Sequence, residues 1–476
     1  MPSPTYGRLP GVVLIGLGSI GRGTLPLILR HFDVDPATVV VVGPESANDA
    51  LFADAGIVRH HATLTPDNVR DVLTPLLRAA AGGEPPFCVN LSVDVDSVEV
   101  IGLCREVGAP YVDTVVEPWP GVYDNPALPL AQRTNLALRR RLLDDRAAHP
   151  TGPTAVSSCG ANPGMVSWLT KQALLDLAAI TGVDAPVGGP ADRAGWAALM
   201  QACGVKGVHI AERDTQRPVR PKPVGAFWNT WSVDGFISEG LQPAELGWGT
   251  HERWLPPGAG GHGDPAAPGI FLPTPGADTR VRTWCPTHGP QHGFLVTHNE
   301  ALSIADYFSV RDGDAVTYRP TCHYAYRPAE VALLSWGELL GGGAITAKHV
   351  LDADEIADGI DELGVLLYGS DAGAYWYGSR LSNDEARALA PHQSATGLQV
   401  TSAVLAAMVW ALEHPDRGIV EADEMDFARC LEVQRPYLGP VEGHRTDWTP
   451  LTDRSPLFPD DIDETDPWQF RNVLVH

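Results

Sequence analysis

Cysteine is scarce in this chain of 476 residues, and the seven that occur are widely spaced. No two of them form a Cys-x-x-Cys pair, so the sequence predicts neither a zinc site nor a disulfide framework. We therefore expect a reducing compartment, and the cytoplasm is the simplest assignment. Nor do the histidines follow any metal-ligand spacing, so we expect no metal at His251, His262, His288, His292 or His298.

Basic side chains and long apolar runs are also scarce. Lysine and arginine number 34 against 58 aspartates and glutamates, and the formal net charge of −24 argues against nucleic acid or an anionic membrane as a partner. The same acidity would attract a cationic substrate or serve solubility alone. Residues 1–11 lack the basic and apolar regions of a signal peptide. The longest apolar helical candidate, 398–412, is shorter than the roughly 20 residues that span a bilayer, so we expect a buried helix.

The first 160 residues alternate short apolar runs with helical patterns, as βαβ units do. Because both faces of such a sheet are covered, the pattern predicts an α/β fold with a Rossmann-type, doubly wound parallel sheet in domain 1–160. The expected strands are Val12–Ile15, Thr38–Val42, Phe87–Leu91, Tyr111–Asp113 and Ala155–Ser157, and the expected helices are 20–30, 66–81, 95–106 and 133–148.

The remaining sequence predicts a second, mixed α/β (α+β) domain at 161–397. Its expected elements are a helix at 167–180 and strands at 205–211, 294–297, 301–308 and 315–318. The Gly-, Pro- and His-rich stretch 256–290 predicts a long irregular excursion. We expect the helix at 398–414 to return to the first domain, and residues 415–476 to form a C-terminal surface segment.

The run Gly16-Leu-Gly-Ser-Ile-Gly21 directly follows the first expected strand and opens a helix. In that context a G-x-G-x-x-G motif predicts dinucleotide binding. Gly16 makes the tight turn, Gly18 lets the backbone approach a pyrophosphate, and Gly21 allows close packing of helix on strand. The amides of Ser19 and Ile20, at the helix N-terminus, would then hold the phosphates.

The end of the second strand decides between NAD and NADP. An acidic residue commonly binds the ribose there, but the strand ends Val42-Gly-Pro-Glu45, which displaces Glu45 from the usual position. Glu45 is therefore either a ribose ligand or a surface residue. No arginine follows closely to bind a 2′-phosphate, which favours NAD.

Polar side chains follow the later strands of the predicted sheet. Carboxyl ends of parallel strands meet at one edge, where ligands bind. We therefore expect the cofactor and the substrate to meet a set of residues that comprises Asn90, Asp94, Asp113, Thr114, Glu117 and Asn162. Two of these have simpler interpretations: Asp94 as the N-cap of the next helix, and Asn162-Pro163 as an ordinary turn before a helix.

The segment 226–252 contains three tryptophans and several acidic residues but no lysine or arginine. Such a composition suits an organic cation, because an aromatic face attracts an ammonium group and carboxylates orient it. Together with the dinucleotide motif, the segment predicts redox chemistry on an amine.

These stretches resemble bacterial homospermidine synthase, a member of the saccharopine-dehydrogenase-like group. The resemblance extends over essentially the whole chain and is carried by Gly16–Gly21, Asn90–Asp94, Cys159–Gly164, Asn229–Phe236 and Glu245–Glu252. It implies a cytoplasmic homodimer with tightly held NAD, formed through the second domain, that acts on putrescine and related polyamines. Such an aminobutyltransferase oxidises putrescine, releases ammonia, transfers the aminobutyl group to a second putrescine and reduces the resulting Schiff base.

The resemblance also implies individual roles. It makes Trp231 the cation–π partner of the substrate ammonium, and Glu212 and Glu239 the carboxylates that bind and relay protons at the inner amine. It places Asp94 and Glu117 along the path on which the amine substrate binds. Asn162 would contact substrate and nicotinamide, and His298 the edge of the pocket.

Simpler interpretations of these residues remain open. Trp231 is alternatively a core residue, as we expect of Trp228 and Trp248. Glu212 is alternatively part of a solvated charge cluster with its neighbours, and Glu239 a loop residue.

Two rival functions remain open. A saccharopine- or carboxyspermidine-dehydrogenase-like oxidoreductase would need a basic residue for a carboxylated substrate. The segment 226–252 supplies none, although Arg213 or Arg282 would have to be considered. The third possibility is a non-catalytic protein that binds NAD as a structural ligand.

Overall fold

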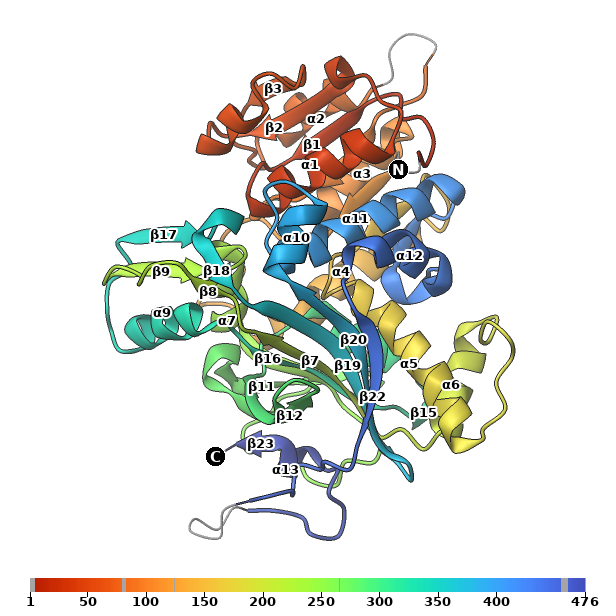
Figure 1. Ribbon diagram of the computed structural model, residues 1–476. Helices are drawn as coiled ribbons and strands as arrows, with labels where there is room; N and C mark the ends of the chain where they lie inside the picture. Colours follow the sequence, from red (N-terminus) through yellow and green to blue (C-terminus); the bar gives the residue numbers. More distant parts are fainter. Residues whose placement is uncertain (1–4, 79–82, 124, 265, 455–460, 476) are drawn as a thin grey trace.

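The computed structural model describes residues 5–78, 83–123, 125–264, 266–454 and 461–475. Two large sheets organise the chain, one in the N-terminal part and one in the middle of the sequence. In Figure 1 the first sheet lies at the top and the second below it, with α11 and α12 beside their junction.

The first sheet confirms the predicted Rossmann-type fold. All its strand pairs are parallel. Its order is β21 (Ile419–Glu421), β6 (Ala155–Ser157), β5 (Tyr111–Asp113), β4 (Phe87–Asn90), β1 (Val12–Ile15), β2 (Val39–Gly43) and β3 (Val58–His61). The associated helices are α1 (Ser19–His31), α2 (Val69–Leu77), α3 (Ser97–Val107) and α4 (Asn135–Ala148).

Two strands of this sheet were not predicted, because β3 has no apolar run and β21 is only three residues long. β3 reads Val-Arg-His-His and is an exposed edge strand, and β21 comes from the C-terminal part of the chain. The helix expected at 66–81 is shorter: α2 ends at Leu77, and residues 79–81 lie outside the described residues.

The second sheet is mixed, as expected for an α+β domain. Strands β7 and β16 are parallel, and their other neighbours are antiparallel. Its order is β22 (Val441–Thr446), β20 (Gly373–Ser382), β19 (Ile360–Ser370), β7 (Gly207–Asp214), β16 (Thr321–Arg327), β13 (Gly289–Phe294), β12 (Arg280–Cys285) and β23 (Leu474–Val475), with β10 (Pro243–Gly247) and β11 (Gly269–Pro275) alongside.

Smaller elements surround this sheet. The helices are α5 (Met165–Thr181), α6 (Arg193–Ala202), α7 (Val233–Leu241), α8 (Asn299–Tyr307), α9 (Glu330–Leu340), α10 (Asn383–Leu389) and α13 (Phe470–Val473). The two-stranded pairs are β9 (Ala226–Asn229) with β17 (Ala347–Val350), β8 (Arg217–Pro218) with β18 (Ile356–Asp358), and β14 (Val310–Asp312) with β15 (Ala315–Tyr318).

Several predictions for this half are wrong. The strand expected at 301–308 is helix α8, which is buried on almost every side and therefore lacks the apolar–polar period of a surface helix. Of the strand expected at 294–297, only Phe294 belongs to a strand. The stretch 256–290, whose residue 265 lies outside the described residues, contains β11 and β12 rather than one irregular loop.

The C-terminal residues 415–476 are only partly a surface segment. They supply β21 to the first sheet, β22 and β23 to the second, and α12 (Phe427–Gln434) to the core. Trp448, Trp468 and Phe470 are buried. The acidic, proline-rich composition of the tail predicted a surface segment, and these few large apolar side chains did not change that average. Residues 455–460 and 476 lie outside the described residues.

Helix α11 (Ala395–Glu413) packs against α1 of the first domain and against α12. By length and composition alone α11 would be able to cross a membrane, but 89% of that stretch is buried inside the protein. The helix therefore joins the two sheets in one hydrophobic core.

Candidate active site

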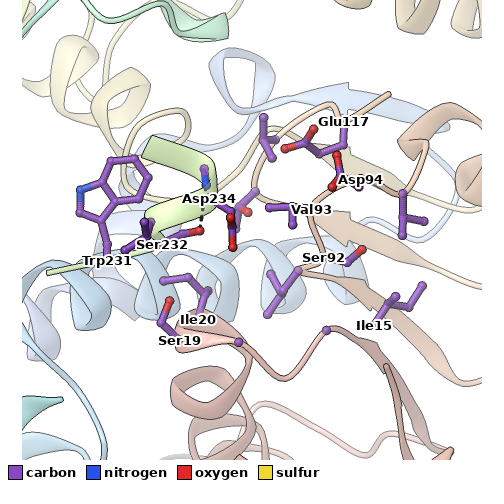
Figure 2. Close-up of a pocket in the computed structure, with 18 of the residues that line it drawn as sticks. Ile15, Ser19, Ile20, Ser92, Val93, Asp94, Glu117, Trp231, Ser232 and Asp234 are labelled. Atoms are coloured by element: carbon purple, nitrogen blue, oxygen red, sulfur yellow. Dashed lines mark hydrogen bonds between the residues drawn. The ribbon is translucent and has the colours of Figure 1, made fainter. Parts of the chain in front are cut away.

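A cavity of about 790 Å³ lies at the carboxyl ends of the parallel strands and continues between the two domains. Its volume is within the range of cofactor and ligand sites, about 300–1,000 Å³. The first domain contributes the loops after β1, β2, β4 and β5, and the second domain contributes β7, α7, β17 and the start of α11. Figure 2 shows Asp94 and Glu117 together on one wall, with Trp231 and Ser232 near Ser19 and Ile20 of the dinucleotide motif.

The dinucleotide motif has the geometry that its glycines require. Gly16 has a φ of +91°, and a Cβ there would lie 2.9 Å from the carbonyl oxygen of Leu91. A Cβ on Gly21 would lie 2.1 Å from the carbonyl oxygen of Gly16. Gly18 is the N-cap of α1 and supplies no side chain to its first amides, so Ser19 and Ile20 can present N–H groups to an anion. Gly16, Gly18, Ser19 and Ile20 line the cavity, whereas Gly21 lies behind it.

The residue expected at the ribose, Glu45, is exposed and does not line the cavity. Its neighbours Pro44, Ser46 and Asn48 line the cavity instead, so the structure favours the surface interpretation of Glu45. The Asn48 amide donates to the carbonyl of Leu17 at 2.7 Å, which ties this loop to the motif.

Arg59 lies near the part of the cavity where the ribose is expected, but its guanidinium group already has partners. Arg59 donates to the carbonyl oxygen of Val41 at 2.8 Å and pairs with Asp49 at 2.8 Å. It does not line the cavity. Arg59 is therefore not available to bind a 2′-phosphate, which fits NAD better than NADP.

Two expected cofactor ligands lie beneath the cavity rather than in it. Asp113 is buried and accepts hydrogen bonds from the Tyr111 hydroxyl at 2.7 Å and the Ser158 amide at 2.6 Å; burial raises its pKa to about 7. Asn90 is buried and accepts from the Ser92 hydroxyl at 2.6 Å. These groups anchor the strand-end loops and are not among the residues that line the cavity. Thr114 does line the cavity.

The acidic residues predicted for the substrate, Asp94, Glu117, Glu212 and Glu239, all line the cavity. Asp94 is not the N-cap of α3, because Asp96 accepts the hydrogen bond from the first-turn amide instead. Burial, together with the charges of Glu239 and Asp94, raises the pKa of Glu117 to about 8. Concentrated carboxyl groups of this kind favour the binding of a cationic ligand.

Glu212 is buried at the inner end of the cavity, so it is not part of a solvated charge cluster. Its carboxyl group accepts hydrogen bonds from the Asn162 amide at 3.0 Å and from the Tyr324 hydroxyl, and it shares a further hydrogen bond with the carboxyl group of Asp361. Burial raises the pKa of Glu212 to about 7. Arg213, on the opposite face of the strand, donates to Gln291 at 2.8 Å.

His298 joins two carboxylates. Its Nε2 lies 3.1 Å from Glu239 and its Nδ1 lies 3.1 Å from Glu300. Burial alone would lower the pKa of His298, but the two carboxylates outweigh that effect and raise it well above its usual value. The imidazole therefore carries a positive charge at neutral pH. Its ring packs on Tyr324 at a centroid distance of 4.5 Å.

The three tryptophans of segment 226–252 differ in their surroundings. Trp231 is half-buried and lines the cavity. Trp228 is buried, and the Arg220 guanidinium lies 5.4 Å from its ring. Trp248 packs against Phe470 at 5.9 Å. Within the described chain, the recorded contacts of cations with aromatic rings do not involve Trp231, so its ring is available to a ligand.

Two other acids of this segment, Glu245 and Glu252, are structural. Glu245 is fully buried, accepts from the Asn135 amide at 2.8 Å at the start of α4, and pairs with His262 at 3.1 Å. Glu252 accepts from the Thr321 hydroxyl at 2.6 Å and the Phe470 amide at 2.9 Å. They hold the second domain to α4 and to the C-terminal tail.

Sequence reasoning missed several residues of the site. Glu300 contacts His298 from α8, where a strand was expected. The cavity-lining residues that were not predicted include Ser46, Asn48, Tyr324, Lys348, His349 and Thr396. Strand β17, which carries Lys348 and His349, pairs with β9 more than a hundred residues earlier. No local pattern in the sequence predicts that pairing.

Comparison with known proteins gives a consistent result over the full chain. Residues 12–156 match the saccharopine dehydrogenase NADP binding domain, and residues 160–447 match the saccharopine dehydrogenase C-terminal domain. The homospermidine synthase of Mesorhizobium japonicum is 59% identical, over 99% of this chain and 98% of that protein. The homospermidine synthase of Blastochloris viridis is 60% identical, over 99% of each. The crystal structure of the homospermidine synthase of Legionella pneumophila in complex with NAD superposes with a TM-score of 0.92, at 40% identity and over 99% of each chain.

Proposed function

The chain belongs to the homospermidine synthase family, and we propose that it converts two molecules of putrescine into homospermidine and ammonia with NAD as its cofactor. One observation carries the proposal: a single cavity joins the dinucleotide motif to an acid-lined end that contains the available ring of Trp231. A redox cofactor and an organic cation would therefore meet in the same space.

The residues present fit NAD. Backbone amides at Gly18, Ser19 and Ile20 would hold the pyrophosphate at the start of α1, and Thr114 and Asn162 line the cavity farther along. When bound, NAD accepts a hydride from the amine carbon of the substrate and later returns it. The engagement of Arg59 by Asp49 supports NAD over NADP.

The ammonium ends of the substrate have distinct partners in this proposal. Trp231 binds the distal ammonium through its ring, while Asp94 and Glu117 line the path of the diamine. The pKa of Glu117 is raised to about 8, and a cation beside this carboxyl group favours its ionised form. The positive charge that Glu239 and Glu300 maintain on His298 disfavours a second cation beside it. The amine nearest His298 is therefore held neutral, the form from which a hydride can leave and which can act as a nucleophile.

Glu212 is suited to move the proton between the two nitrogens. After hydride loss the first amine becomes an iminium group, the neutral nitrogen of the second putrescine attacks its carbon, and a new C–N bond forms. A proton must pass from the attacking to the departing nitrogen before ammonia leaves. A carboxyl group with a pKa of about 7 can accept and release that proton near neutral pH. Hydride return then completes homospermidine, without net oxidation.

The proposal is tested by product analysis. Purified protein is incubated with putrescine and a sub-stoichiometric amount of NAD, and the products are identified by mass spectrometry while NADH is followed by absorbance. We expect homospermidine and ammonia in equal amounts without accumulation of NADH. Absence of homospermidine would contradict the proposal.

The cavity gives little support to the rival functions. Neither Arg213 nor Arg282 lines it, and Lys348, which does, is already paired with Asp234. A carboxylated amine would therefore find no unpaired lysine or arginine among the described residues of the lining. Stoichiometric NAD(P)H turnover with such a substrate would favour the saccharopine- or carboxyspermidine-dehydrogenase-like alternative. Complete lack of chemistry with retained NAD would favour a non-catalytic role.

We further propose a cytoplasmic homodimer. The seven cysteines are free and buried, which suits a reducing compartment. Leu241, Leu334 and Leu340 are exposed on α7 and α9, which supports an apolar contact between subunits through the second domain. Light scattering after size-exclusion chromatography measures the mass: twice the chain mass is expected, and a monomer at micromolar concentration would contradict the dimer.

A further inference from the structure

The geometry points to Tyr326 as a positioning residue that fixes the orientation of the Trp231 ring. Tyr326 does not line the cavity and would act on the substrate only through Trp231. The inference rests on the proposed role of Trp231 as the site of the substrate ammonium.

A single hydrogen bond links the two side chains. The indole N–H of Trp231 donates to the Tyr326 hydroxyl oxygen at 3.0 Å, and within the described residues this is the partner recorded for that N–H. An indole nitrogen is only a donor, so the acceptor on this one side sets the rotation of the ring. The contact holds the nitrogen edge against the protein and leaves the ring exposed to the cavity.

Tyr326 is itself held rigidly. It is fully buried in the centre of the second sheet, on β16, opposite Glu212 of β7 and Phe294 of β13. Its ring stacks on Tyr324 at 5.2 Å with an interplanar angle of 10°. A hydroxyl group on a central strand has few alternative positions. The hydrogen bond that the Tyr326 hydroxyl accepts from Trp231 therefore has a fixed direction.

Phe236 of α7 completes the support. Its ring lies 5.2 Å from Trp231 and 5.7 Å from Tyr326, so it fills the angle between the two side chains. Packing against Phe236 limits translation of the indole, whereas the hydrogen bond to Tyr326 limits its rotation. Without the hydroxyl, the indole N–H would have to turn toward another acceptor, and the ring would turn with it.

The hydroxyl remains an acceptor over the whole working range of pH. Burial and the neighbouring carboxyl groups of Glu212, Asp214 and Asp361 raise the pKa of Tyr326 well above its usual value. Tyr326 therefore keeps its proton when the carboxyl groups around it titrate. A positioning role should consequently be independent of pH, unlike a role in proton transfer.

A double-mutant cycle tests the inference. Tyr326→Phe removes the hydroxyl, and Trp231→Phe keeps an aromatic ring but removes the N–H. Putrescine binding is measured by calorimetry on protein loaded with NADH, which cannot accept a hydride from the diamine, for wild type, both single variants and the double variant. We expect Tyr326→Phe to raise the Kd about 10-fold with Trp231 present, the size of one lost hydrogen bond, and to have no further effect when residue 231 is Phe.

The matched control is Tyr368→Phe on β19. Tyr368 is equally buried, its hydroxyl has no hydrogen-bond partner among the described residues, and it does not line the cavity. We expect this variant to bind putrescine as the wild type does. An equal effect of Tyr326→Phe in both backgrounds, or of Tyr368→Phe, would overturn the inference. Wild-type protein that binds no putrescine would instead refute the proposed function.

A second measurement does not depend on binding or turnover. In protein labelled with nitrogen-15 at tryptophan, the indole signal of Trp231 is the one that disappears in Trp231→Phe. We expect this N–H to exchange slowly with solvent in the wild type and at least 10-fold faster in Tyr326→Phe. Unchanged exchange would contradict a hydrogen bond between the two residues.

Discussion

Trp231 differs from the other tryptophans of its segment in having a ring that faces the cavity. We predict that Trp231→Leu lowers kcat/KM for putrescine roughly 30-fold or more, since a desolvated cation–π contact contributes about 2 kcal/mol. Bound NAD and the melting temperature should change little, because leucine preserves much of the packing against Phe236. Trp248→Leu, beside Phe470, is the matched control and should lower the melting temperature while kcat/KM is kept. Wild-type kcat/KM in Trp231→Leu would contradict the assignment.

Glu212 makes a prediction about pH. Its buried carboxyl group has a pKa of about 7, so the ionised form that accepts a proton increases as pH rises through neutrality. We expect kcat/KM for putrescine to rise about 10-fold per pH unit below pH 7 and to level off above it. The apparent pKa belongs to the whole cluster, because Asp361 shares a hydrogen bond with Glu212.

We predict that Glu212→Gln loses most of the activity and also the rise of kcat/KM with pH below pH 7. The pH dependence of the melting temperature provides the control. The raised pKa means that the folded state holds the proton more tightly than the unfolded state, so the contribution of Glu212 is fully present below about pH 4.5 and declines as pH rises through 7. The glutamine variant should therefore melt at a higher temperature than wild type at pH 8 and equally at pH 4. A wild-type pH profile in Glu212→Gln would show that another group carries the proton.

At the scale of elements, the junction of β1 and α1 depends on the absence of a side chain. A Cβ on Gly21 would come within 2.1 Å of the carbonyl oxygen of Gly16, and that backbone atom cannot move without opening the turn that faces the pyrophosphate. We predict that Gly21→Ala loses at least 90% of its bound NAD, measured by absorbance after release from purified protein.

Gly102→Ala provides the comparison for Gly21→Ala. Gly102 also lies within a helix, α3, but a Cβ there would meet nothing within 4 Å. Alanine should stabilise that helix by up to about 1 kcal/mol and leave the bound NAD unchanged. Equal NAD content in the two variants would contradict the close packing of α1 on β1.

The helices and strands also show which parts of the site could be predicted from the sequence. The motif Gly16–Gly21 could be predicted because its geometry depends on consecutive residues. Asp94, Glu117 and Asn162 were placed in the cavity because parallel strands end at one edge. Helix α8 was mistaken for a strand because burial on nearly all sides removes its polar face, and Glu300 was missed with it. Asp113 was expected in the cavity but lies beneath it, because a strand-end carboxylate can point beneath the edge as well as above it.

Residues from the second domain were the hardest to place. Tyr324 reaches the cavity, and Tyr326 lies behind it, because β16 pairs with β7, more than a hundred residues earlier. Glu212 was named from its resemblance alone, since its neighbours in sequence suggested a solvated cluster. Only the three-dimensional pairing shows that the carboxyl group is buried beside Asn162.

At the scale of the whole molecule, segment 348–352 of the second domain lies over the start of α1. Lys348, His349 and Val350 line the cavity, and Asp352 forms an ion pair with Arg22, which follows the dinucleotide motif. The segment thus covers the cofactor end of the cavity and links the two domains. A partly exposed ion pair contributes at most about 1 kcal/mol. Its removal should therefore increase the rate of NAD dissociation by a small factor.

We predict that Asp352→Asn increases the rate of NAD dissociation about 3-fold, measured by dilution of NAD-loaded protein into excess NAD carrying an isotopic label. Asp354→Asn is the matched control, because Asp354 is exposed, lies two residues away and forms no ion pair within the described chain. Equal dissociation rates for both variants and the wild type would show that the ion pair does not retain the cofactor.

The central claim is that oxidation of one putrescine and reduction of its product occur in the same cavity around one retained cofactor. Putrescine that carries deuterium on both carbons next to nitrogen tests this directly, in the presence of excess unlabelled free NADH. If the hydride is stored and returned within the cavity, homospermidine keeps every deuterium of its two precursors. Homospermidine that lacks one deuterium would show that free NADH supplies the hydride, and would contradict the account.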